Sequence, residues 1–281
     1  MAVKTIAVSL ADIARLDAVM SAAFTLASQH EAHVTGIYVI PAMDSFVLPV
    51  NYGAAELDSR RRQFFEQLAP QVREKFDNAV RRYGVTAEWR QLEGKSDLLA
   101  DTVLDHAIYA DLIVAAQVSN NNDRSTVETD FVERLLLGSG RPVLVVPEAG
   151  SFERIGSHAV IGWNATREAI RASFDALPLL TRAKKVDLVW VNAQHEPEIA
   201  GDLPGAELAA VLSRHGVDVT AQSLPAPELS PADALLNHVA SNGADLLVLG
   251  AYGHSRLREL VFGGVTRSIL QTMTVPVLMS H

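Results

Sequence analysis

The sequence contains no cysteine among its 281 residues. Disulfide bonds, thiolate nucleophiles and cysteine-ligated metal sites are therefore excluded, while the compartment is left undecided. The tripeptide Gly-Lys-Ser/Thr is also missing, and without it the chain cannot carry a Walker A phosphate loop. These two absences remove several classes of enzyme and metalloprotein.

Long apolar runs and an excess of positive charge are absent as well. No apolar run approaches the roughly 20 residues that a bilayer-spanning helix needs, and residues 1–12 lack the apolar core and cleavage site of a signal peptide. We therefore expect a cytoplasmic protein. The net charge of −9 argues against general binding of nucleic acid or of anionic membranes. An anionic ligand would have to be held by local donors.

The chain contains the same unit twice. A shift of 134 positions brings residues 110–114, Ala-Asp-Leu-Ile-Val, onto residues 244–248, Ala-Asp-Leu-Leu-Val. The same shift brings Pro-Val-Leu at 142–144 onto Pro-Val-Leu at 276–278 without a gap. Matched blocks in the same order indicate a tandem duplication. We place the boundary between two domains, residues 1–149 and residues 150–281.

Each half alternates predicted strands with predicted helices. In the first half we expect strands near 4–10, 34–40, 86–91, 111–116 and 142–147, and helices near 12–30, 54–83, 97–108 and 126–138. In the second half we expect strands near 158–163, 186–191, 217–223, 245–250 and 276–280, and helices near 166–182, 204–214, 231–242 and 264–273. This alternation predicts an α/β protein with two doubly wound, five-stranded parallel-sheet domains in tandem.

A group of glycines follows the fourth predicted strand of the second half. Gly250 and Gly253 come where the chain leaves an apolar strand, and Gly263 and Gly264 precede a helical pattern. Glycine lets backbone N–H groups approach a ligand closely, and a helix start adds the positive end of its dipole. The spacing Gly-x2-Gly-x9-Gly differs from the dinucleotide fingerprint, yet it is suited to holding phosphate.

The glycine spacing between a buried strand and a helix, ahead of a terminal Val-Pro-Val strand, resembles the universal stress protein family. The ATP-binding members of that family carry Gly-x2-Gly-x9-Gly-Ser/Thr at this place, whereas Gly264 stands here at the Ser/Thr position. Five parallel strands per half also match that family, whose fold is Rossmann-like and adenine nucleotide α-hydrolase-like. The resemblance covers nearly the whole chain and implies a tandem two-domain member.

The resemblance also implies which residues contact a nucleotide. Asn164 holds the place of an Asp that meets the nucleotide in relatives, and Val191 corresponds to an aliphatic residue near adenine. The phosphates would lie against the backbone of the loop, and Thr266 would partly replace the missing hydroxyl. The implied binding residues are Asn164, Val191, Gly250, Gly253, Gly263, Gly264, Val265 and Thr266. The implied cofactors are ATP and an accompanying Mg²⁺.

The first half has lost this loop. At the 134-residue shift the four glycines are replaced by Ala116, Ser119, Thr129 and Asp130. Side chains at these positions would obstruct the close approach of the backbone, and a carboxylate at a helix start would repel phosphate. We therefore interpret the first domain as a structural or regulatory partner with a degenerate phosphate loop, and expect one nucleotide per chain.

Three classes of function follow from these observations. The leading interpretation is a stress-response binding module that binds ATP or another adenine nucleotide in the second domain only, with at most slow ATP hydrolysis. The alternative is a structural or interaction protein whose pocket is empty or holds another small molecule. An adenylyl-transfer enzyme is less favoured, because the phosphate motifs it would need near its first strand are absent.

Two further expectations concern assembly and histidines. The fifth strands, 143–146 and 277–280, are apolar sheet edges, so we expect them to face each other in an intramolecular pseudo-dimer, with a homodimer left open. His106 and His238 recur in the two halves, which indicates a shared packing role. No metal site is predicted.

Overall fold

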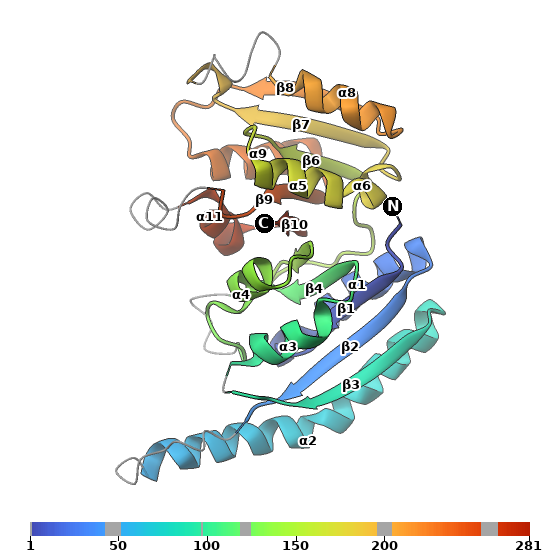
Figure 1. Ribbon diagram of the computed structural model, residues 1–281, viewed down its shortest axis with the longest axis vertical. Helices are drawn as coiled ribbons and strands as arrows, with labels where there is room; N and C mark the ends of the chain where they lie inside the picture. The colour runs from blue at the N-terminus through green and yellow to red at the C-terminus, as the bar shows by residue number, and fades with distance from the viewer. Residues whose placement is uncertain (1, 43–51, 97, 119–124, 196–203, 254–263) are drawn as a thin grey trace. The chain divides into compact units, whose positions relative to one another are not determined.

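The computed structural model describes residues 2–42, 52–96, 98–118, 125–195, 204–253 and 264–281. Contacts divide the chain into two compact units, an N-terminal unit, Val3–Ser139, and a C-terminal unit, Gly140–His281 together with the first two residues. Both units are α/β (Figure 1).

The described part of the N-terminal unit is built on four parallel strands in the order β3-β2-β1-β4. Its elements are β1 (Thr5–Ser9), the 3-10 turn η1 (Ile13–Arg15), α1 (Leu16–His30), β2 (His33–Ile40), α2 (Tyr52–Tyr83), β3 (Ala87–Glu93), α3 (Leu99–Ala107), β4 (Leu112–Ala116) and α4 (Phe131–Gly138). Because all four strands are parallel, their carboxyl ends lie at one edge of the sheet.

In its described residues, the C-terminal unit carries six strands in the order β5-β10-β9-β6-β7-β8. Its elements are β5 (Val143–Val146), β6 (His158–Gly162), α5 (Arg167–Asp175), α6 (Leu177–Leu180), β7 (Lys185–Val191), η2 (Ala193–His195), α8 (Ala206–Arg214), β8 (Val219–Leu224), α9 (Pro231–Asn242), β9 (Leu246–Gly250), α11 (Val265–Thr272) and β10 (Val277–Ser280). Strands β6 to β10 are parallel to one another. The predicted α/β fold class is therefore confirmed.

Strand β5 joins this sheet in the opposite direction. It pairs antiparallel with β10, with Leu144 opposite Leu278 and Val145 opposite Val277. The two apolar runs expected to face each other are thus hydrogen-bonded partners. The contact division falls before β5 for this reason, although the sequence repeat places that strand at the end of the first half.

The repeated Ala-Asp pair has a structural explanation. The carboxylate of Asp111 accepts hydrogen bonds from the backbone N–H groups of Lys4 and Thr5, at 2.8 and 2.9 Å. In the other unit the carboxylate of Asp245 accepts one from His158 N–H at 3.0 Å. In both units the aspartate before the fourth strand of the repeat fixes the start of the first, so the repeated motif sets strand register.

Two predicted helices are shorter than expected. The helix expected over 126–138 begins only at Phe131, because Thr126 and Glu128 are engaged elsewhere in the unit through their side chains. The helix expected over 166–182 is divided into α5 and α6, where Pro178 occupies the first turn of α6 and has no N–H to continue α5. By contrast, the start of α9 is as predicted, since Ser230 accepts a hydrogen bond from Asp233 N–H at 3.1 Å.

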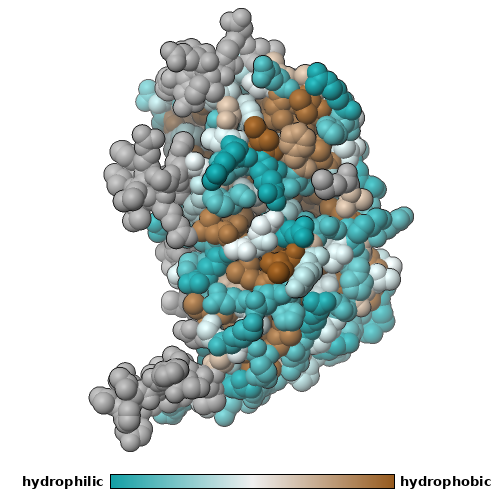
Figure 2. All heavy atoms as spheres, in the orientation of Figure 1, coloured by the Kyte–Doolittle hydropathy of each residue, from teal (hydrophilic) through white to brown (hydrophobic). Residues whose placement is uncertain are grey.

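The core of each unit is apolar and centred on its sheet. Strands β4, β5 and β10 are buried at every position. Polar residues cover much of the visible face and alternate with apolar patches (Figure 2). Within the described residues, no helix is both long enough and apolar enough to cross a membrane.

Candidate functional site

The carboxyl edge of the C-terminal unit concentrates unusual backbone conformations. Ala165, Asn192 and Tyr252 all adopt positive φ angles, of 56°, 55° and 55°. Each follows a strand end, of β6, β7 and β9 respectively. Such conformations cost of order 1–3 kcal/mol each and cluster at functional sites. The edge where the sequence predicted a ligand is therefore also where this unit holds its left-handed non-glycine residues.

Gly250 at the end of β9 is required by packing. An added Cβ there would lie 2.4 Å from the backbone nitrogen of Ala169 and 2.5 Å from the carbonyl carbon of Glu168. Both atoms belong to the first turn of α5, which crosses directly over β9. No side chain can be accommodated without moving the helix. Tight contact between helix and sheet is thus a sufficient reason for this glycine.

Gly253, three residues later, lies beside a buried carboxylate. Its added Cβ would stand 3.0 Å from Oε2 of Glu168 and 3.5 Å from Oγ1 of Thr166. Gly253 itself is exposed. The backbone here is open to a ligand on one side and adjoins α5 on the other. Only a residue without a side chain keeps this approach unobstructed.

The loop after β9 is tied to the start of α11. The backbone N–H of Tyr252 donates to Oγ1 of Thr266 at 3.2 Å, and Thr266 is buried. Its hydroxyl therefore has a partner within the loop. Gly264 is the N-cap of α11, and the first N–H groups of a helix have no acceptor within the helix. Val265, the first helical residue, is 37 % exposed.

The remaining predicted residues lie on neighbouring strands. Asn164 is exposed beyond the end of β6, and its side-chain oxygen accepts a hydrogen bond from Thr166 at 2.8 Å. Val191 is the half-buried last residue of β7, the strand next to β6. In the sheet β6 lies between β9 and β7, so the carboxyl ends of these three strands are neighbours. Gly263 lies outside the described residues.

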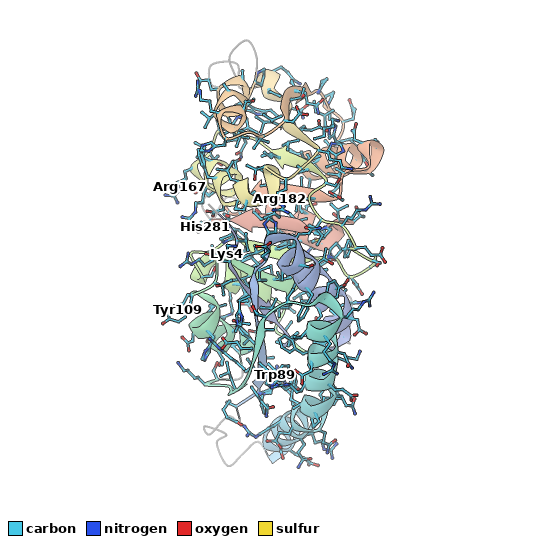
Figure 3. The ribbon with its side chains drawn as sticks, turned by 90° about the vertical axis from the view of Figure 1, so that its right-hand side faces the viewer. Lys4, Trp89, Tyr109, Arg167, Arg182 and His281 are labelled. Carbon is cyan, nitrogen blue, oxygen red and sulfur yellow. The ribbon has the colours of Figure 1, made fainter. Side chains whose placement is uncertain are left out.

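Glu168 is a residue that the sequence analysis did not single out. It occupies the second position of α5, is 3 % exposed and pairs with the guanidinium of Arg167. Arg167 extends into solvent on the same side of the C-terminal unit as His281 (Figure 3). Burial by itself raises the pKa of Glu168, but Arg167, a backbone N–H and the charge of His281 together lower the pKa below its usual value. The carboxyl group is therefore ionised at neutral pH.

The residues present fit a phosphate-bearing ligand. Gly253 offers exposed backbone without a side chain, and Gly264, the N-cap residue of α11, places no side-chain acceptor on the first N–H groups of the helix. Backbone N–H groups and a positive helix end are suitable donors for phosphate. The hydroxyl of Thr266 is oriented by the loop itself. A phosphate group bound here would be held mainly by backbone donors.

The corresponding edge of the N-terminal unit is occupied by its own side chains. Both carboxylate oxygens of Glu128 accept from the first N–H groups of α3, those of Leu99 and Ala100, at 3.2 and 2.7 Å. Thr126 donates to the carbonyl of Ala11, the residue that aligns with Asn164. An anion at this helix start would have to displace Glu128. The first N–H groups of α3 are thus satisfied within the N-terminal unit.

Asp12 adds a second carboxyl group to that edge. It accepts hydrogen bonds from Ser125 Oγ at 3.2 Å and from Ala14 N–H at 3.3 Å. Burial raises the pKa of the Asp12 carboxyl against the opposing effect of these donors. Asp130 caps the start of α4 and pairs with Arg134 at 2.8 Å. A carboxylate, that of Asp130, therefore stands where the C-terminal unit has Gly264.

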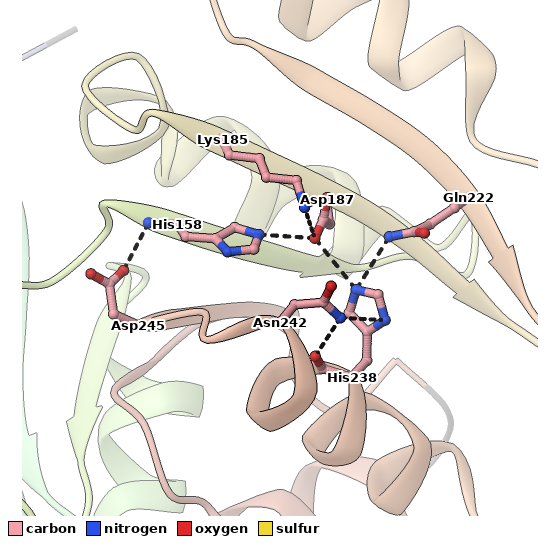
Figure 4. A network of polar contacts seen from close by, with 7 residues as sticks. All are labelled: His158, Lys185, Asp187, Gln222, His238, Asn242 and Asp245. Atoms are coloured by element: carbon pink, nitrogen blue, oxygen red, sulfur yellow. Dashed lines mark hydrogen bonds and ion pairs between the residues drawn. The ribbon is translucent and has the colours of Figure 1, made fainter.

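A polar cluster at the opposite edge of the C-terminal sheet surrounds Asp187 (Figure 4). Its carboxylate accepts from His158 Nε2 at 2.9 Å and Lys185 Nζ at 3.1 Å, with His238 Nε2 at 3.4 Å. Burial raises the pKa of Asp187, but the donors outweigh it and the pKa lies below its usual value. His238 is thus a polar anchor between α9 and β7. No cluster that could bind a metal occurs among the described residues.

Comparisons with known proteins agree with this architecture. Residues 228–281 match the model of the universal stress protein family. The chain is 28 % identical over 149 residues to universal stress protein Slr1230 of Synechocystis, covering 52 % of this chain and 49 % of that protein. It is 42 % identical over 48 residues to universal stress protein YxiE of Bacillus subtilis, covering 17 % and 32 %. The matches span about half and a third of these relatives.

A solved structure resembles the chain over nearly its full length. It is a universal stress protein from Archaeoglobus fulgidus, which matches with a TM-score of 0.67 over 98 % of this chain and 95 % of its own. The sequence identity is 13 %, so this likeness concerns the fold alone. The likeness in fold covers both units.

Proposed function

We propose, on the premise that this chain belongs to the universal stress protein family, that its C-terminal unit binds one adenine nucleotide, ATP or a relative of it. The binding surface is the carboxyl edge formed by the ends of β7, β6 and β9 and the start of α11. The bound nucleotide makes the chain a nucleotide-responsive binding module. We assign no efficient catalytic step to it.

The observation that carries this proposal is the hydrogen bond from Tyr252 N–H to Oγ1 of Thr266, which ties the segment after β9 to the first turn of α11. The Tyr252–Thr266 hydrogen bond holds the backbone near Gly253 beside the helix start at Gly264. Phosphate oxygens would accept from these backbone N–H groups, with Gly250, Gly263 and Val265 completing the loop. Binding oriented by the backbone does not need the hydroxyl that Gly264 lacks.

The base and ribose would lie over the neighbouring strand ends. Asn164 offers an exposed amide for a hydrogen bond, and Val191 offers an aliphatic surface. When Mg²⁺ accompanies the nucleotide, it neutralises phosphate charge. This is relevant in a protein with a net charge of −9. The N-terminal unit binds no nucleotide in this proposal, because Asp130 stands at the start of α4, where the C-terminal unit has Gly264, and its carboxylate would repel phosphate.

The intramolecular pseudo-dimer of the two sequence repeats is also a proposal. The antiparallel pairing of β5 from the first repeat with β10 from the second supports it. Separating the repeats between residues 149 and 150 would remove β5 from its partner. We expect fragments that precipitate or self-associate in size-exclusion chromatography. Two soluble monomeric fragments would count against the pairing as a stabilising contact.

Titration calorimetry tests the nucleotide proposal. The intact chain, titrated with ATP in the presence of Mg²⁺, should bind with a stoichiometry near one. Gly253→Asp puts a carboxylate into the phosphate path and should abolish binding, whereas Gly253→Ala should weaken it only moderately, since its Cβ meets flexible side chains. Ser119→Asp, the aligned position of the first half outside the described residues, is the matched control and should bind normally.

The outcomes separate the function classes. Two nucleotides per chain would contradict the assignment to the C-terminal unit. Unchanged binding by Gly253→Asp would remove the loop from the site. No binding of any adenine nucleotide would favour a structural or interaction protein, for which the packing roles of Gly250 and Thr266 would be sufficient.

A further inference from the structure

Glu168 carries a buried charge that takes no part in the proposed contacts with the nucleotide. Its side chain is 4 % exposed, yet its described ion-pair partner, Arg167, is 87 % exposed and lies at the surface. A carboxylate in this position is shielded from water but only partly neutralised. Such a group acts on its surroundings more strongly than a surface carboxylate, because solvent screens it less.

Its location is set by the glycine loop. Oε2 of Glu168 lies 3.0 Å from where a Cβ of Gly253 would be, and Gly250 packs directly on the backbone of the same helical turn. The carboxylate is therefore held against the segment whose backbone would meet the phosphates. The sequence alone does not reveal this, since an acidic residue in the first turn of a helix is ordinary.

The charges around Glu168 come from several elements. On α5 it faces Arg167, and the charge of His281, beyond β10, also acts on it. Thr166, which caps α5, adds a hydroxyl near Gly253 but no charge. Burial raises the pKa of Glu168, but Arg167 and His281 lower it below its usual value, so the carboxylate remains negative at neutral pH.

We infer that Glu168 makes the site discriminate by phosphate charge, favouring a nucleotide with one phosphate, or a polyphosphate neutralised by Mg²⁺, over free ATP. This inference rests on the proposed function and adds the ligand class that the site accepts. A buried carboxylate beside the phosphate path repels each added phosphate charge. A divalent cation relieves the repulsion, because Mg²⁺ is readily held between carboxylate and phosphate oxygens.

The intact protein supplies the first test. Affinities for AMP, ADP and ATP are measured by calorimetry in EDTA and again in excess Mg²⁺. In EDTA, ATP should bind about tenfold or more weakly than AMP, the scale of one close unscreened charge pair at a protein surface. Mg²⁺ should remove most of this difference. Equal affinities of AMP and free ATP in EDTA would overturn the inference.

Three variants assign the effect to the residue. Glu168→Gln keeps the shape of the side chain and should raise the affinity for free ATP about tenfold while leaving AMP nearly unchanged. Arg167→Gln removes the exposed ion-pair partner of Glu168 and should lower the affinity for free ATP further. Glu207→Gln on α8, an exposed acid, changes the net charge equally and should have no such effect.

The inference and the function on which it rests fail differently. If no adenine nucleotide binds to any variant with or without Mg²⁺, both fall together. If nucleotides bind but the ratio of AMP to ATP affinity is the same in Glu168→Gln as in the intact protein, only the inference is refuted. Should Glu168→Gln not fold, the nucleotide series on the intact protein and Arg167→Gln still decide.

Discussion

Gly250→Ala separates the packing role of the glycine loop from its role in binding. The added methyl group would meet the Ala169 nitrogen at 2.4 Å and the Glu168 carbonyl carbon at 2.5 Å, both well inside van der Waals contact. These are backbone atoms of α5 and cannot rotate away. The helix must therefore shift on β9, with loss of contacts along both elements. We expect Gly250→Ala to lower the free energy of unfolding of the ligand-free protein.

The size of the loss follows from what the methyl group meets. Overpacking of a well-packed core costs about 1–3 kcal/mol, and a backbone obstacle places Gly250→Ala at the upper end, about 3 kcal/mol. Gly162→Ala is the matched comparison. Its Cβ would approach Leu249 Cδ2 to 2.3 Å, an equal overlap, but with the movable end of a side chain. About 1 kcal/mol is expected there.

Urea unfolding without nucleotide provides the measurement. In a Trp89→Phe background the remaining tryptophans, Trp163 and Trp190, both report on the C-terminal unit. The midpoint should drop markedly for Gly250→Ala and slightly for Gly162→Ala. Equal losses for the two variants, or a loss below about 1 kcal/mol for Gly250→Ala, would refute the reasoning from backbone contact.

Three other predictions follow from the side-chain contacts. Thr266→Val removes the acceptor for Tyr252 N–H and should weaken ATP binding in calorimetry by about tenfold, while Thr272→Val, farther along α11, should not. Asp187→Asn should cost about 2 kcal/mol in urea unfolding at pH 7. The folded-state pKa of Asp187 is depressed, so its stabilisation is present above the unfolded pKa of about 4 and is lost as pH falls through the folded value. The free energy of unfolding of Asp187→Asn should therefore fall less steeply at acid pH than that of the intact protein. Glu128→Ala uncaps α3 and should lower stability by about 1–2 kcal/mol, with faster hydrogen exchange at the first turn of α3.

Much of the fold could be predicted from the sequence. The repeat at 134 positions, the alternation of strands and helices and the start of α9 all depend on local pattern, which single residues such as Ser230 reveal. The helix expected over 126–138 was wrong in extent because Thr126 and Glu128 bond to residues far away in the chain. Such partners compete with helix formation and leave no local signal.

The candidate site was predictable only in part. The glycines marked the loop, but the sequence could not show that Gly250 is fixed by the backbone of α5 or that Thr266 bonds within the loop. Glu168 resembled any first-turn acid until its burial was visible. The interpretation of His238 as a packing residue was incomplete, because it also faces the buried Asp187. In each case tertiary contact, rather than residue type, decides the role.

The pairing of β5 with β10 has a consequence for synthesis on the ribosome. Val143–Val146 leaves the ribosome long before Val277–Ser280 does, yet the two strands are hydrogen-bonded partners. During that interval an apolar strand edge has no β10 to cover it. In the nascent chain, the apolar edge of β5 that later pairs with β10 therefore stays unpaired while the second repeat is translated. Chaperone contact at β5 during translation, or slower folding when synthesis pauses within the second repeat, is the expected cellular consequence.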